Sequence, residues 1–199
     1  VPQSEINRIL VDEALQGHRV VRLKGGDPYV LGRGGEEAEF CRQSGVDVEV
    51  VSGVTSAISV PAAAGIPVTH RGLAKGFSVV TGHEELSEVP ARSDHTVILL
   101  MGVGQLRDSA ASLGRAGLPP ETPVGIVENG YLPDQRVTIG TLGTIADQAE
   151  AAGVANPAVI VIGDVVRVSP FAPSHFKTAD YSTTSPNAPR TTKTRVLTP

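Results

Sequence analysis

Residues 23–37, LKGGDPYVLGRGGEE, hold the densest group of residues in the chain that could bind a ligand. The segment lies where a predicted strand ends and a predicted helix begins, which is where open α/β sheets bind ligands. Gly25 and Gly26 leave the main chain open to a bound group, and Asp27 can accept hydrogen bonds from a ligand amine or hydroxyl. The same residues could instead form only a tight connection between strand and helix.

Further candidates follow other predicted strands or lie between the two predicted lobes. They are Thr55 and Ser56 in SGVTSA, His70 and Arg71 in VTHRG, Met101 in LLMG, and Gly130 in ENG. Each has a structural alternative. Thr55 or Ser56 could cap the following helix, the two charged residues could be solvated, the methionine could be core, and ENG is a common turn.

Several well-known motifs are absent. GRGGEE is not a G-x-G-x-x-G dinucleotide fingerprint, and neither a P-loop, a zinc-protease H-E-x-x-H nor a G-x-S-x-G sequence occurs. The single cysteine, Cys41, excludes an intramolecular disulfide and a thiolate-rich zinc site. We interpret Cys41 as a small packed residue, and no metal site is predicted.

Composition narrows the class of protein. The 199 residues are 40% hydrophobic and 19% charged, which is enough apolar material for a packed core. The net charge of −4 argues against a nucleic-acid partner. No apolar run reaches the roughly 18 residues that span a bilayer, so no membrane partner is predicted. No leader-like segment opens the sequence, and a cytoplasmic location is expected.

Predicted helices and strands alternate along the chain, and they position the candidate residues. Helices are predicted over 2–18, 33–45, 55–65, 104–117 and 144–153, and strands over 18–25, 46–53, 77–82, 95–102, 122–130, 135–142 and 157–166. The strand predicted over 135–142 could pair with the strand before it, over 122–130. This alternation indicates an α/β protein with largely parallel strands. An aperiodic stretch near residues 67–76 suggests two lobes, over 1–68 and 69–168.

Both ends of the sequence differ from the body. The first helix begins at Pro2 with only Val1 before it, and valine is a poor N-cap. We therefore expect a fragment that lacks upstream elements, with its first lobe incomplete. Residues 169–199 are rich in proline, threonine and serine, which predicts a disordered tail.

Seven stretches of the sequence, taken in order, resemble the tetrapyrrole methylase family, and within it the C-methyltransferases of uroporphyrinogen III. The resemblance rests on VPQSEIN, VVRLKGGDPYVLGRGGEEAE, VVSGVTSA, AGIPVTHRGLA, VVTGHE, LLMG and PVGIVENG, and it runs from residue 1 to about residue 168. It implies S-adenosylmethionine as methyl donor, uroporphyrinogen III as substrate and precorrin-2 as product, on the route to sirohaem and cobalamin. It also implies two α/β lobes with the donor between them, in a homodimer. A later corrinoid methylase, or a remnant that binds without catalysing, are the alternatives.

The resemblance assigns roles by motif. The donor-binding positions would be Gly25, Gly26, Asp27, Val30, Thr55, Ser56, Met101 and Gly130, with alanine also common in relatives where Ser56 stands. The carboxylate-rich substrate would need cations, and Arg22, Lys24, Arg33, His70 and Arg71 are the candidates. The family's G-x-G-P-G-D loop and its proposed proton-transfer Asp and Lys lie before the PQ-x-EIN helix in relatives, and this sequence has no match to them. The catalytic acid and base are therefore unknown.

Overall fold

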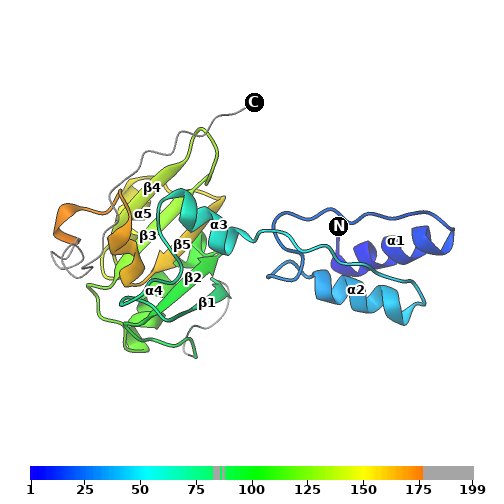
Figure 1. Cartoon of the computed structure of the whole chain (residues 1–199), viewed down its shortest axis with the longest axis horizontal. Coiled ribbons are helices and arrows are strands. Elements are labelled where there is room, and N and C mark those ends of the chain that lie inside the picture. Colours follow the sequence, from blue (N-terminus) through cyan, green and yellow to red (C-terminus); the bar gives the residue numbers. More distant parts are fainter. Residues whose placement is uncertain (83–85, 87, 177–199) are drawn as a thin grey trace, which may run out of the picture.

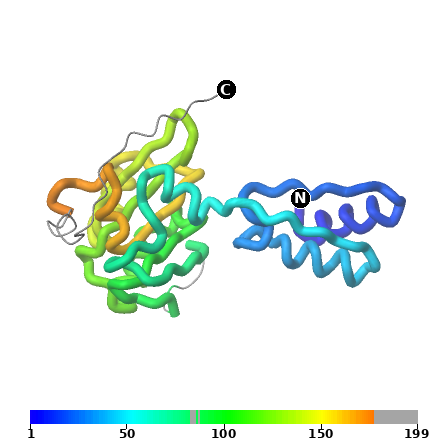
Figure 2. The backbone as a smooth tube through the Cα atoms, in the orientation of Figure 1, coloured from blue at the N-terminus to red at the C-terminus, as the bar shows by residue number. Residues whose placement is uncertain are grey.

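A computed structural model describes residues 1–82, 86 and 88–176, which form two parts of different architecture (Figure 1). The N-terminal part holds two helices, and the C-terminal part holds a five-stranded sheet with helices on both faces. The chain just before helix α3 joins the two parts as a single thin connection (Figure 2). The prediction of an α/β fold in two parts is therefore confirmed.

The N-terminal part is built on helices α1 (Gln3–Leu15) and α2 (Gly34–Gln43), which pack against each other. Both were predicted from the sequence, α1 from its apolar stripe and α2 from the glycine that ends it. Their apolar surface is only partly covered, because Val11 is buried whereas Ile9 and Leu15 are exposed. The two helices therefore bury little apolar area beyond their mutual contact.

The strands predicted over 18–25 and 46–53 are wrong. Both segments run as extended chain beside α1 and α2 (Figure 2), but neither forms a β-ladder. Val21 and Leu23 are 78% and 84% exposed. Valine-rich sequence favours an extended backbone, but a strand forms only where a neighbour takes up its N–H and C=O groups. Within the described residues, neither segment has such a neighbour.

The sheet of the C-terminal part has the order β1-β2-β5-β3-β4. Its strands are β1 (Gly76–Thr81), β2 (His95–Leu100), β3 (Pro123–Glu128), β4 (Arg136–Thr141) and β5 (Ala158–Ile162). The expectation of largely parallel pairing is wrong, since only β1 and β2 are parallel. The short loop after β3 makes β4 its antiparallel hairpin partner, and β5 enters between β2 and β3 antiparallel to both.

Alternating side chains divide the core between the two faces of the sheet. On β5, Ile160 and Ile162 face helices α4 (Leu106–Arg115) and α5 (Ile145–Ala151). Val159 and Val161 face the other side, where α3 (Ser56–Ala63) and the 3-10 helix at Asp164–Val168 pack. A strand covered on both faces reads as a continuous apolar run, as residues 158–162 do.

Helix α3 packs on the sheet of the C-terminal part, against β5 and β2. Ala57 at its start is fully buried in the same cluster as Val159 and Val161. The division of the chain at residue 68 stays a prediction. The start of the predicted tail is also packed. Ser169 Oγ donates to the Ala64 carbonyl at 2.7 Å, and Phe176 is buried. Residues 177–199, the rest of that tail, lie outside the described residues.

Candidate functional site

Two loops of the N-terminal part meet just before α3. The GGD loop (residues 25–30) follows the first extended segment, and the SGV loop (residues 52–55) follows the second. The main-chain N–H of Gly53 donates to Asp27 Oδ2 at 3.1 Å. The loops that carry the two strongest sequence motifs are therefore in direct contact.

The meeting point lies at the first turn of α3. A Cβ placed on Gly26 would lie 3.5 Å from Thr55 Cα, and Gly26 itself has a φ of +71°. Thr55 caps the helix, because its Oγ1 accepts a hydrogen bond from the Ala57 N–H at 3.3 Å. The capping alternative for Thr55 is thus confirmed. Ser56 follows as the first, exposed residue of α3.

The GGD loop leaves open space on one side. Nothing lies within 4 Å of the position that a Cβ on Gly25 would occupy. Val30, half-buried, turns back on the loop, since its N–H donates to the Asp27 carbonyl at 3.3 Å. A flat ligand group could approach the main chain beside Gly25, where no side chain blocks it.

Arg33 stands at the start of α2 in a left-handed conformation with a φ of +59°. Its guanidinium Nη2 donates to Glu36 Oε2 at 2.7 Å, and Nε donates to the same carboxylate at 3.1 Å. This hydrogen bond raises the pKa of Arg33 and lowers the pKa of Glu36. The side chains of Arg33 and Glu36 are both exposed. Non-glycine residues held at positive φ cluster at functional sites, and Arg33 is one of these.

Glu37 is a buried carboxylate that was not among the predicted site residues. A single oxygen, Oε1, accepts from Gln3 Nε2 at 3.0 Å and from Lys24 Nζ at 3.1 Å, with Arg22 Nη2 at 3.4 Å. Burial alone would raise the pKa of Glu37, but these donors and charges outweigh it and lower the pKa. The carboxylate thus joins α1, α2 and the segment that leads into the GGD loop.

Two of the residues predicted to bind the substrate are ion-paired with Glu37 in this cluster. Lys24, with a side chain only 14% exposed, and Arg22 are both engaged by Glu37. The second glutamate of GRGGEE was the available signal, since a charged residue on a helix face turned toward its neighbours needs a partner.

His70 and Arg71 lie in a turn of the C-terminal part that follows α3. His70 Nδ1 donates to the Arg71 carbonyl at 2.9 Å, and the main chain of His70 bridges to Ala74. The Arg71 side chain is exposed. The role of these two residues in substrate binding stays a prediction.

Met101 and Gly130 follow the ends of β2 and β3. Met101 is 50% exposed at a φ of +55°, so the core alternative for this methionine is wrong. Gly130 lies against Val60 of α3, with a virtual Cβ 2.8 Å from Val60 Cγ1. Five residues separate Thr55 from Val60, which is about 8 Å along a helix axis. Helix α3 therefore connects the GGD and SGV loops to the ENG turn, whereas the described contacts give Met101 no such link.

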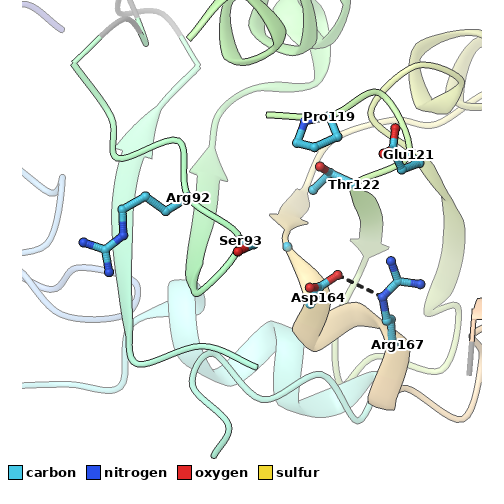
Figure 3. A pocket seen from close by; sticks show the side chains of 8 residues that line it. Arg92, Ser93, Pro119, Glu121, Thr122, Asp164 and Arg167 are labelled. Carbon is cyan, nitrogen blue, oxygen red and sulfur yellow. Dashed lines mark hydrogen bonds and ion pairs between the residues drawn. The ribbon is translucent and has the colours of Figure 1, made fainter. Parts of the chain in front are cut away.

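A separate pocket of 170 Å³ lies at the other end of the sheet (Figure 3). It is lined by Arg92, Ser93, Pro119, Glu121, Thr122, Gly163, Asp164 and Arg167. Arg92 and Ser93 precede β2 while Met101 follows it, so the pocket lies about 20 Å from Met101 along the strand. Arg167 Nε donates to Asp164 Oδ1 at 2.8 Å. None of the predicted site residues lines this pocket.

Other predictions concern metal, thiol and membrane chemistry. Cys41 is buried, and burial followed by the charge of Glu37 raises the pKa of its thiol, which agrees with a packed residue. Across residues 1–82, 86 and 88–176, no group of three or more His, Cys, Asp or Glu side chains could hold a metal ion. No helix in that part of the chain has the length and apolar character needed to cross a membrane.

The sequence and the fold both match a known family. A profile of the tetrapyrrole (corrin/porphyrin) methylases matches residues 1–146. The chain belongs to this family. Relatives agree: the S-adenosyl-L-methionine-dependent uroporphyrinogen III methyltransferase of Methanosarcina barkeri is 50% identical over 174 residues, covering 83% of this chain and 68% of the relative.

Two further relatives set the extent of the match. The uroporphyrin-III C-methyl transferase of Thermus thermophilus, crystallised with S-adenyl homocysteine, superposes with a TM-score of 0.74 at 42% identity. The match covers 86% of this chain and 74% of that one. The sirohaem synthase of Gluconobacter oxydans is 47% identical over 84% of this chain, but the chain spans only 37% of its length.

Proposed function

We propose that this chain takes part in the S-adenosylmethionine-dependent C-methylation of uroporphyrinogen III to precorrin-2. The contact between Asp27 and Gly53 carries the proposal, since it joins the GGD and SGV loops beside the open main chain at Gly25. Support comes from the relatives, which are named for this reaction and include a structure with S-adenyl homocysteine.

The residues fit a sulfonium nucleotide in one specific respect. The GGD loop offers main-chain groups with open space at Gly25, and the SGV loop leads into the N-terminus of α3. Together they form a main-chain cradle that a larger side chain would fill. The proposed donor positions are Gly25, Gly26, Asp27, Val30, Thr55, Ser56, Met101 and Gly130.

Methyl transfer mainly requires that the donor and the acceptor carbon be correctly aligned. When bound, the sulfonium supplies an electrophilic methyl group. The task of this chain is to hold the donor and to orient an electron-rich pyrrole carbon toward it, because correct orientation removes much of the entropic barrier. Arg33, His70 and Arg71 would receive the carboxylates of the tetrapyrrole through charge-assisted hydrogen bonds. Proton transfer is assigned to no residue.

The decisive experiment is a calorimetric titration of the chain with S-adenosylhomocysteine. Saturable binding at one site is expected, and adenosine without the amino-acid moiety should bind more weakly. An unmodified chain that is folded by circular dichroism yet shows no heat of binding would contradict the proposal. The resemblance further implies a homodimer and a cytoplasmic location, and both belong to this proposal. Light scattering at several concentrations tests the dimer.

A second function, binding without catalysis, has one observation in its favour. The two extended segments expose Val21, Leu23 and Val51 and have no strand partner among the described residues, and such edges pair readily with other chains. Turnover with uroporphyrinogen III separates the two functions. Product formation supports the methyltransferase, while donor binding without any product supports the second function.

A further inference from the structure

The pocket shown in Figure 3 is built by three loops at the end of the sheet opposite Met101. The loops precede β2, precede β3 and follow β5, and they meet because β5 lies between the other two strands and runs antiparallel to both. The volume of the pocket is 170 Å³. An engineered cavity of about 150 Å³ in another protein holds benzene, so a ligand of about six non-hydrogen atoms fits here.

Two side chains of opposite charge line this pocket without pairing with each other. Arg167 extends from the 3-10 helix after β5 toward the loop that carries Glu121 (Figure 3). Its Nε donates to Asp164 Oδ1 at 2.8 Å, and its Nη1 donates to the Phe176 carbonyl at 3.2 Å. Among the described residues, no hydrogen bond or ion pair takes up Nη2 of Arg167 or the carboxylate of Glu121. Both groups can therefore bind a ligand without giving up a contact.

The fold holds these two groups before any ligand binds. The Arg167 guanidinium lies over the ring of Phe176, 5.9 Å from its centroid, in addition to its two hydrogen bonds. Glu121 is carried by a tight turn, which the Thr122 N–H closes by donating to the Pro119 carbonyl at 3.0 Å. Groups that are ordered in advance lose less entropy when a ligand binds, which favours binding of even a small molecule.

Gly163 leaves one wall of the pocket without a side chain. Its φ of +139° favours glycine, and a Cβ there would lie 3.2 Å from the His95 carbonyl oxygen. Thr96 lies behind this wall, with its Oγ1 3.7 Å from the same virtual Cβ. That hydroxyl is buried and has no hydrogen-bond partner within the described part of the chain. Buried polar groups nearly always have a partner, so the hydroxyl is an independent sign of a polar ligand or bound water at this wall.

We propose that this pocket binds a small zwitterion, namely a free α-amino acid with a short side chain. Its carboxylate would accept from Arg167 Nη2, and its ammonium would donate to the carboxylate of Glu121. The hydroxyls of Ser93 and Thr122, which also line the pocket, can bond to either end. An anion alone would be repelled by the glutamate, and a cation alone by the arginine, so a ligand that carries both charges fits best.

Three probes with nearly the same skeleton test the two charges separately. L-Alanine carries both charges, L-lactate has a hydroxyl in place of the ammonium, and L-alaninamide has an amide in place of the carboxylate. In titrations of the full chain followed by two-dimensional NMR, L-alanine should shift the Gly163 and Thr122 amides and saturate in the millimolar range. Lactate and alaninamide should bind at least about tenfold more weakly, because each lacks one charge-assisted hydrogen bond. Equal binding of lactate indicates a simple anion site and overturns the inference, as does the absence of any saturable shift.

Glu121→Gln connects the ammonium of the ligand to one residue. The variant keeps the size of the side chain and removes its charge, so L-alanine should bind about tenfold more weakly, whereas L-lactate should bind no more weakly than before. Glu39→Gln, exposed on α2, is the matched control and should bind L-alanine like the unmodified chain. Unchanged L-alanine affinity in Glu121→Gln overturns the inference. The test is independent of the proposed function, since Glu121→Gln should leave any binding of S-adenosylhomocysteine unchanged.

Discussion

Gly130, in the turn after β3, lies directly against the side chain of Val60 in α3, with a virtual Cβ only 2.8 Å from Val60 Cγ1 and 3.0 Å from Cγ2. The β-branched side chain of a helical valine has essentially one rotamer, so Val60 cannot move aside. This contact fixes the ENG turn relative to the helix that begins at Thr55. Through this contact, α3 links the ENG turn to the GGD and SGV loops, which together make up most of the proposed donor site.

Replacing Gly130 by alanine should therefore lower both stability and donor affinity. Overpacking of this kind costs about 1–3 kcal/mol, and the shifted turn should weaken S-adenosylhomocysteine binding. Urea denaturation and calorimetry measure the two effects. Gly114→Ala is the control, because it lies in α4 with open space beside it and should raise helix stability. A Gly130→Ala protein as stable as the unmodified chain would show that Val60 does not fix the turn.

Glu37→Gln should destabilise the N-terminal part. The change removes the charge that Lys24 and Arg22 share, while the amide oxygen can still accept from Gln3. A hydrogen bond to a charged group contributes about 1.5–3 kcal/mol, which sets the expected loss of unfolding free energy near neutral pH. Glu39→Gln on the same helix is exposed and should change little.

The same carboxylate predicts a pH dependence. Because the folded pKa of Glu37 is lowered, its stabilising effect is complete above the ordinary carboxyl pKa of 4.5 and disappears as the pH falls through the lowered value. The stability difference between the unmodified chain and Glu37→Gln should therefore be largest near neutral pH and shrink below about pH 4. Chemical denaturation at a series of pH values measures it. A difference that grows on acidification would contradict the assignment.

Arg33→Ala and Arg71→Ala should weaken binding of the tetrapyrrole more than binding of the donor. A charge-assisted hydrogen bond to a carboxylate is worth about tenfold in affinity or more, and neither side chain is assigned to the donor. Fluorescence titration with uroporphyrin III and calorimetry with S-adenosylhomocysteine give the two constants. Arg115→Ala, exposed on α4, is the control. Equal losses for both ligands would contradict the substrate assignment.

Arg136→Ala should destabilise the C-terminal part by about 2 kcal/mol. Arg136 Nη2 donates to Glu128 Oε1 at 2.6 Å and to the Gly153 carbonyl at 3.0 Å, and Glu128 is only 3% exposed. Removing the partner of a buried carboxylate costs about 3–5 kcal/mol, and the half-exposed guanidinium places this pair below that range. Thermal unfolding measures the loss. Arg107→Ala breaks only exposed ion pairs, so its melting temperature should barely change.

Sequence patterns alone determined the helices α1, α2, α4 and α5 and the five strands of the sheet, since each of these elements carries its own apolar pattern or end signal. It also indicated the GGD and SGV loops, because glycines and a turn residue at the end of an extended segment are local signals. The family motifs lie on those same loops.

Other features were decided only by tertiary structure. Residues 18–24 and 46–54 have the composition of strands, yet pairing depends on a neighbour that composition cannot specify. The direction of β5 and the packing of α3 on the sheet depend on which apolar faces meet. Lys24 and Glu37 are thirteen residues apart, so only the fold brings their charges together. Such long-range contacts arise from packing, which is non-local, whereas helices and turns follow from interactions between near neighbours in the chain.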